Sequence, residues 1–163
     1  MVKLKDFSVS NSKYCYLLMR EYFLVNWWMY CIPLIACILA GLFDFRFILV
    51  ALMIMFILIP MALYFVYVTY GLLPENRYSI MKKNAIVNEK GIELHLSEEY
   101  VKNTNKHIFI SWTTIEKIKI TNHFMLIFFK IGKFRFLVVP TESFYKIDDF
   151  KVFVDLAVSQ LKN

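Results

Sequence analysis

Two long apolar runs separated by a short polar interruption constrain the fold of this chain more than any other feature. The runs cover Trp27–Phe43 and Phe47–Tyr70, and neither contains Asp, Glu, Lys, Arg or His. A helix of about 20 apolar residues crosses a hydrocarbon core of roughly 30 Å, and its backbone groups satisfy one another where water is absent. The interruption is Asp44-Phe45-Arg46. The sequence therefore predicts a transmembrane hairpin of two helices.

The basic residues predict how this hairpin is oriented. Both flanks of a hairpin lie on the same side of the membrane, and the tip carries Arg46 alone. The basic residues near the membrane ends of the flanks are Lys13, Arg20, Arg77, Lys82 and Lys83. Because cytoplasmic flanks are enriched in Lys and Arg, we expect both termini to be cytoplasmic. The net charge of +6 is mixed in sign and scattered, so nucleic acid is not an expected partner.

Length and cysteine content limit the remaining fold. A chain of 163 residues has room for one hairpin and one small soluble domain. Cys31 and Cys37 lie in the first apolar run and Cys15 lies upstream of it, so the three cysteines do not form a disulfide framework.

Upstream of the hairpin, the pattern predicts an extended segment followed by a helix. Leu4–Val9 is the extended segment. Ser10, Asn11 and Ser12 then offer capping side chains for a helix that begins near Lys13.

Downstream of the hairpin, apolar residues recur at every second position, which predicts antiparallel strands. A polar loop is expected at Tyr100–Lys106, a corner at Trp112-Thr113-Thr114, and a positive φ at Gly91. The expected strand segments are Ala85–Asn88, Ile92–Leu96, His107–Ser111, the Ile115, Ile118 and Ile120 segment, Phe124–Lys130 and Phe134–Val139. The chain ends in a predicted amphipathic helix with an apolar face formed by Ile147, Phe150, Val154, Ala157 and Leu161.

These elements predict an α+β membrane protein: a two-helix transmembrane hairpin and a small antiparallel sheet or barrel capped by the C-terminal amphipathic helix. In this fold Trp112 and Phe150 are expected core residues that join the sheet to the helix.

The segment Phe109-Ile110-Ser111-Trp112-Thr113-Thr114-Ile115-Glu116-Lys117-Ile118, followed by a strand that ends in Val139-Pro140, resembles the YcxB-like proteins of bacteria. These are small membrane proteins whose cytoplasmic part is similar to a pleckstrin-homology (PH) domain, so the resemblance implies a location in the bacterial inner membrane. The resemblance implies a PH-like domain at residues 71–163, a hairpin at 27–70, and an N-terminal strand and helix at 1–26 that joins the cytoplasmic domain. The family pattern commonly has a basic residue after the proline, where this chain has Thr141.

Residues with catalytic chemistry are not arranged in any recognisable motif. The sequence has no Gly-rich phosphate loop, nucleophile elbow or His-Glu-x-x-His motif. His95, His107 and His123 have no Cys or carboxylate at metal-ligand spacing, so we expect strand-surface or turn positions for them. Glu98-Glu99 is expected on a solvated face. The sequence therefore predicts no enzyme, no cofactor and no metal site.

Three surfaces are candidates for binding. A basic surface for anionic lipid would contain Lys117, Lys119, Lys130, Lys133 and Arg135, although the same residues fit a solvated sheet face. The segment Phe124–Phe129 is apolar on both faces, so its second face meets the hairpin, a second copy or a partner, or packs within the fold. Small residues expected at contacts between membrane helices are Ala36, Ala40, Gly41, Ala51 and Ala62.

These features predict a non-enzymatic interaction module, anchored in the inner membrane, that binds a protein partner at the cytoplasmic face. One alternative is an immunity protein that neutralises a membrane-targeting antibacterial toxin, an idea that rests on size and topology. Another alternative is a PH-like module that binds anionic lipid. The expected partners are membrane lipids and a protein, which is a toxin in the immunity hypothesis, or a second copy of the chain.

Overall fold

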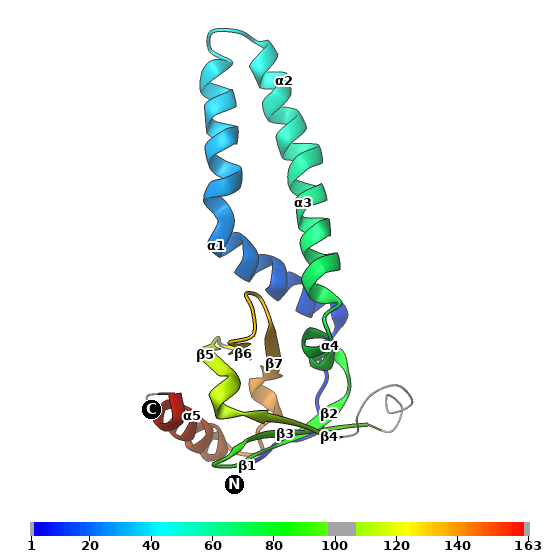
Figure 1. The fold of residues 1–163 in the computed structure, drawn as a ribbon, viewed down its shortest axis with the longest axis vertical. Helices are drawn as coiled ribbons and strands as arrows, with labels where there is room; N and C mark the ends of the chain where they lie inside the picture. The colour runs from blue at the N-terminus through cyan, green and yellow to red at the C-terminus, as the bar shows by residue number, and fades with distance from the viewer. Residues whose placement is uncertain (1, 98–106, 162–163) are drawn as a thin grey trace. The chain divides into compact units, whose positions relative to one another are not determined.

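The computed structural model describes residues 2–97 and 107–161. It divides into two compact units: Met1–Tyr14 with Leu73–Asn163, and Cys15–Leu72 (Figure 1). The first unit combines helices with antiparallel strands, whereas the second is helical. The predicted loop Tyr100–Lys106 and the pair Glu98-Glu99 lie outside the described residues.

The helical unit contains two helices that are long and apolar enough to cross a membrane, judged by length and composition. The first is α1 (Asn11–Ala40), which begins two residues before the predicted start. The second runs continuously over Arg46–Gly71. It consists of α2 (Arg46–Met53), the π-helical η1 (Ile54–Leu58), α3 (Ile59–Val66) and the π-helical η2 (Tyr67–Gly71).

The ends of these helices are set by identifiable side chains. The Oγ of Ser10 accepts a hydrogen bond from the backbone N–H of Lys13 at 3.4 Å, which confirms the predicted cap. At the tip, the Asp44 carboxylate accepts from the backbone N–H of Arg46 at 2.9 Å. The positive end of the second helix's dipole also stabilises a negative charge at this position. A Cβ on Gly41 would overlap Ile48, so this glycine lets the tip pack closely against α2.

A four-stranded antiparallel sheet has the order β1-β2-β3-β4. Its strands are β1 (Val2–Lys3), β2 (Lys83–Val87), β3 (Gly91–Leu96) and β4 (His107–Ser111). Val2 pairs with Val87, so a strand before the helical unit joins a strand after it. The predicted extended segment Leu4–Val9 is not a continuous strand: Leu4 and Phe7 form isolated bridges to Phe144 and Lys83.

A three-stranded antiparallel sheet has the order β5-β6-β7. Its strands are β5 (Ile115–Ile120), β6 (Phe124–Phe129) and β7 (Phe136–Pro140). The predicted corner is a single 3₁₀ turn, η4 (Trp112–Thr114), between β4 and β5. The remaining helices are α4 (Pro74–Ile80), η5 (Thr141–Ser143) and α5 (Ile147–Leu161).

The predicted positive φ at Gly91 and the predicted start of the last strand are both wrong. Gly91 has no positive φ; it is required because a Cβ at this position would overlap the backbone carbonyl of Ile110 on β4. In the β6–β7 turn, Phe134 has a positive φ of 61°. The strand predicted to begin at Phe134 therefore begins at Phe136.

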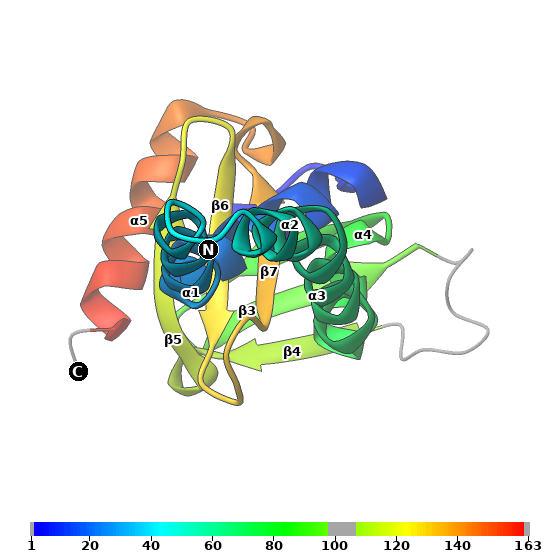
Figure 2. The same cartoon turned by 90° about the horizontal axis from the view of Figure 1, so that it is seen from above.

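One hydrophobic core lies between the two sheets and α5, which runs beside β5 (Figure 2). Trp112 is 4% exposed, as predicted for a core residue, and its indole N–H donates to the Asn88 carbonyl at 3.0 Å. The helix residue that meets this indole is Phe153, with ring centroids 6.1 Å apart. Phe150, the predicted core residue of α5, is half-buried and packs against this core with its ring on Phe144. Ile147, predicted on the apolar face, is 78% exposed.

The strand β6 is buried on both of its faces. Met125 and Ile127 contribute to the core described above. On the other face, Phe128 packs on Phe136 at 5.2 Å between ring centroids, and Phe136 packs on Tyr14 at 5.7 Å. Packing within the fold, one of the alternatives for this apolar segment, therefore accounts for part of its second face.

Candidate functional site

The five predicted basic residues fall into a turn and a neighbouring strand. Lys130, Lys133 and Arg135 lie in the β6–β7 turn, and the backbone N–H of Lys130 donates to the Thr114 carbonyl at 2.9 Å. Lys130 and Lys133 are exposed, and Arg135 is half-buried. The structure thus gathers three of the five residues at the end of the sheet where β5 begins.

The other two basic residues lie on β5, where Lys117 is exposed. The Lys117 ammonium lies 4.9 Å from the centroid of the Phe128 ring, a cation–π contact that directs its charge over the sheet. Lys119 is two residues further along the strand and is half-buried. We therefore define the basic turn as Lys130, Lys133 and Arg135.

An apolar cavity of about 180 Å³ lies between the two sheets. Two large side chains on its lining are exposed, Phe109 at 55% and Ile131 at 66%, and Ile131 belongs to the same turn as Lys130 and Lys133. The complete lining is Tyr78, Leu94, Ile108, Phe109, Ile110, Thr114, Phe129, Ile131 and Leu137. An apolar cavity with exposed aromatic and aliphatic side chains is typical of a surface that receives an apolar group.

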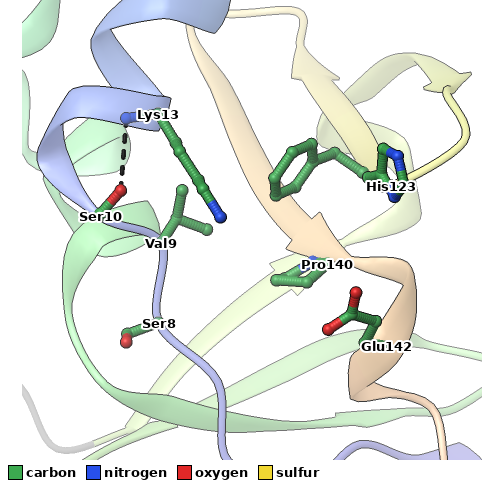
Figure 3. A pocket seen from close by; sticks show the side chains of 8 residues that line it. Ser8, Val9, Ser10, Lys13, His123, Pro140 and Glu142 are labelled. Carbon is green, nitrogen blue, oxygen red and sulfur yellow. Dashed lines mark hydrogen bonds between the residues drawn. The ribbon is translucent and has the colours of Figure 1, made fainter.

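A larger open pocket of about 640 Å³ has a polar lining (Figure 3). Its charged and titratable side chains are Lys13, His123 and Glu142, all exposed. The other lining residues are Ser8, Val9, Ser10, Phe124 and Pro140. Sequence reasoning missed this pocket because its walls come from the N-terminal segment, the β5–β6 turn and the end of β7.

The order of elements around Trp112 is the one on which the family resemblance rests. The segment Phe109–Ile118 forms the end of β4, the η4 corner and the start of β5, and β7 ends at Pro140 before the terminal helix. Residues 87–157 match the YcxB-like protein family. The match begins at the last residue of β2 and ends within α5. No curated protein and no solved structure matches the chain.

The YcxB-like region, residues 87–157, contains the basic turn, Phe109 and Ile131, and all three histidines. It covers less than half of the 163-residue chain and does not include the helical unit. The small residues predicted at helix contacts therefore lie outside the match. Ala36 is exposed, Ala51 is buried, and Ala40, Gly41 and Ala62 are half-buried. Their role as contact residues stays a prediction.

Two histidines of the YcxB-like region form a pair that sequence reasoning missed. His95 on β3 and His107 on β4 are Cα partners, and their Nδ1 atoms lie within hydrogen-bonding distance of each other. The sequence signal was a histidine on each of two adjacent predicted strands. The register that opposes them depends on residues 91–111 as a whole, which local patterns do not specify. His123 lies apart from the pair, in the β5–β6 turn.

One buried titratable residue lies where the chain returns from the helical unit. Lys83 is 1% exposed, and its ammonium donates to the Ser79 and Met81 carbonyls, both at 3.1 Å. It also lies 4.5 Å from the centroid of the Phe7 ring. Burial lowers the pKa of Lys83 from 10.5 to about 7, because the charged form loses its hydration.

Proposed function

We propose that this protein is a membrane-anchored, non-enzymatic interaction module whose PH-like domain binds a protein partner at the cytoplasmic face of the bacterial inner membrane. The observation that carries the proposal is the surface of the two long helices. In their most apolar 18-residue windows, 0% of the first and 6% of the second is buried in the chain itself. Apolar surface of this extent requires a lipid or protein environment.

The connectivity of the chain supports the placement of both flanks of the hairpin on the same side of the membrane. The helical unit is inserted between β1 and β2, which pair with each other, so both of its ends join the same folded unit. If each helix crosses the bilayer, the folded unit lies on one side and the Asp44–Arg46 tip lies on the other. The basic flanks favour the cytoplasmic side for the folded unit.

The PH-like assignment is supported by strand number and order. A four-stranded antiparallel sheet, a three-stranded antiparallel sheet and a C-terminal helix that covers their shared core are the parts of a PH-type domain. Such domains act as binding modules, and this analogy of fold sets the class of function that we propose.

The surface that we propose for the protein partner surrounds the apolar cavity. Phe109 and Ile131 are 55% and 66% exposed at its mouth. Exposed aromatic and aliphatic side chains beside a cavity are the usual anchors of protein–protein contacts. A photo-crosslinking amino acid at Phe109 should then give one defined adduct in native membranes, whereas the same group at Ile147, 78% exposed on α5, should give none.

The partner's identity follows from the mass and stability of that adduct. Substitution of Ile131 by Ser should abolish the Phe109 adduct, since the substitution removes an apolar anchor without touching the core. An adduct of twice the chain's mass would identify a second copy as the partner. Equal crosslinking at Phe109 and Ile147, or an adduct unaffected by Ile131→Ser, would contradict the proposed surface.

Anionic lipid is a second candidate ligand, and the basic turn favours it. Ile131 stands between Lys130 and Lys133, so one exposed turn offers an apolar tip flanked by cations. Cations near a negatively charged leaflet contribute about 1 kcal/mol each. In nanodiscs that contain anionic lipid, a fluorophore at Ile131 should be quenched by brominated lipid. Quenching should be much weaker in neutral lipid. It should also be much weaker in 1 M salt, where the Debye screening length is about 3 Å.

Charge reversal tests the same candidate. Lys130→Glu with Lys133→Glu should abolish the quenching, whereas reversal of two exposed lysines elsewhere, Lys90 and Lys151, should leave it unchanged. Quenching that is equal in neutral and anionic nanodiscs would remove anionic lipid as the ligand of this turn.

A further inference from the structure

The paired histidines lie on the outer face of the four-stranded sheet, and His107 precedes Phe109 by two residues on β4. On β3, His95 alternates with the buried Leu94 and Leu96, and its partner His107 is exposed at the start of β4. The two rings are nearly perpendicular, with centroids 4.5 Å apart and an interplanar angle of 87°. The Nδ1 atom of each ring faces the Nδ1 atom of the other.

The two nitrogens of His95 differ in accessibility. Its Nε2 atom is buried and has no hydrogen-bond partner among the described residues. A ligand from solvent therefore reaches His95 through Nδ1, which is the nitrogen that faces His107. In the metal-free pair, one proton lies between the two Nδ1 atoms, so one ring donates and the other accepts.

We propose that His95 and His107 form a binding site for a divalent transition metal of the zinc class, with the two Nδ1 atoms as ligands. Neutral imidazole suits Zn²⁺, Cu²⁺ and Ni²⁺, whereas Mg²⁺ and Ca²⁺ prefer oxygen ligands. The metal takes the position of the shared proton, which moves to the Nε2 atom of the ring that carried it, so both imidazoles stay neutral. The site is independent of the proposed function.

The geometry requires a small adjustment of the rings. Two nitrogens bound to Zn²⁺ at about 2.0–2.1 Å in a tetrahedral arrangement lie roughly 3.3 Å apart. The paired Nδ1 atoms are already at hydrogen-bonding distance, so rotation of the exposed His107 ring opens the gap without moving the strands. Cross-strand pairing of the backbone fixes the two Cα positions.

The polar neighbours of the pair lie in the same row across the sheet. Asn84 on β2 is the Cα partner of His95, and its amide donates to the Asp6 carboxylate at 3.3 Å. No described group of three His, Cys, Asp or Glu side chains is placed to hold a metal, so the remaining positions on the ion belong to water. With a metal at Nδ1, the neutral His95 ring carries its proton on the buried Nε2 atom, which has no acceptor among the described residues, and this costs affinity. The site is therefore open and exchangeable, unlike a four-ligand structural site.

Metal titration of the full-length protein, purified in detergent without a histidine tag, tests this inference. Calorimetry with ZnCl₂ should show one site per chain, and His95→Ala or His107→Ala should weaken it at least tenfold. The matched control is His123→Ala, which removes an exposed histidine outside the pair and should change the affinity less than twofold. Zn²⁺ should also raise the thermal midpoint of the wild-type protein and not that of His107→Ala.

A spectroscopic measurement identifies the ligands directly. The electron paramagnetic resonance spectrum of bound Cu²⁺ should show two imidazole nitrogens in the wild-type protein and one in His107→Ala. Because His107 is exposed, its substitution should leave the fold intact, which the metal-free thermal midpoint checks. Wild-type affinity in His107→Ala, or an equal loss in His123→Ala, would overturn the proposed site.

Discussion

Lys83 is the residue whose environment differs most from what its side chain prefers. Its described partners are two backbone carbonyls and the Phe7 ring, which favour the ammonium, while burial opposes the charge. Burial dominates, so the pKa falls to about 7. The residue joins the segment before the helical unit, through Phe7, to the end of α4 after it.

Lys83 should make stability depend on pH. Its pKa is about 7 in the folded chain and 10.5 for an ordinary lysine in the unfolded chain, so between these values the unfolded chain binds more protons. The free energy of unfolding should therefore rise with pH in this window, by up to about 1.4 kcal/mol per pH unit. Thermal unfolding of the full-length protein in detergent measures the trend. It should disappear in Lys83→Met and persist in Lys82→Met, since Lys82 is exposed; an equal trend in both variants would contradict the assignment.

Trp112 should be the largest single contributor to the core of the YcxB-like region. Its indole is buried against Phe153 and hydrogen-bonded to the Asn88 carbonyl. Trp112→Ala should lower the free energy of unfolding by about 3–5 kcal/mol. The aromatic control is Tyr145→Ala, because Tyr145 is 61% exposed and should lose less than about 1 kcal/mol. Equal rates of proteolysis for Trp112→Ala and Tyr145→Ala would contradict this role.

At the residue level, the sequence predicted the side chains whose role depends only on residues close to them along the chain. The cap at Ser10 and the buried Trp112 follow from positions relative to their own elements. Two features do not follow from such positions. The requirement for Gly91 depends on the approach of β4, and the contact of Phe153 with Trp112 depends on the rotation of α5 about its axis.

At the scale of elements, α4 protects an open sheet edge. The strand β7 is at the edge of the three-stranded sheet, and two side chains of α4 satisfy its outer backbone groups. Asn76 accepts from the Phe136 N–H through Oδ1 at 3.0 Å, and Ser79 accepts from the Val138 N–H through Oγ at 3.0 Å. An uncovered edge would be a template for pairing with other chains.

Removing these side chains should weaken the attachment of α4. Asn76→Ala and Ser79→Ala should each lower the free energy of unfolding by about 1–3 kcal/mol, since each leaves a buried backbone N–H of β7 without its acceptor. Ser159→Ala is the control, because that hydroxyl is exposed and bonds within its own helix. Thermal midpoints of the two α4 variants equal to that of Ser159→Ala would contradict the proposed edge protection.

The strands were predictable as elements, and their pairing was not. Alternation located β3 and β4 because one face of each is buried, and β4 has the predicted bounds His107–Ser111. Which residues oppose each other depends on loop lengths and on the whole sheet. The histidine pair and the pocket at Lys13, His123 and Glu142 both arise from that pairing.

At the scale of the whole molecule, the chain inserts a helical unit into a folded unit. The insertion point between paired strands explains why residues 1–14 and 73–163 fold together. Apolar runs predicted the helices because their composition suffices to define them. The immunity hypothesis rests on size, topology and the lack of a recognisable catalytic motif, and it stays a prediction.

Cysteine labelling tests the proposed membrane topology most directly. In a chain with Cys15, Cys31 and Cys37 replaced by Ala, single cysteines are placed at Phe45 in the tip and at Lys90 in the β2–β3 turn, both exposed. In intact bacterial cells, a membrane-impermeant maleimide should label the Phe45→Cys variant and leave the Lys90→Cys variant unlabelled until the membrane is permeabilised. Labelling of the Lys90→Cys variant in intact cells, or equal labelling of both variants, would contradict a hairpin that spans the membrane with the PH-like domain inside.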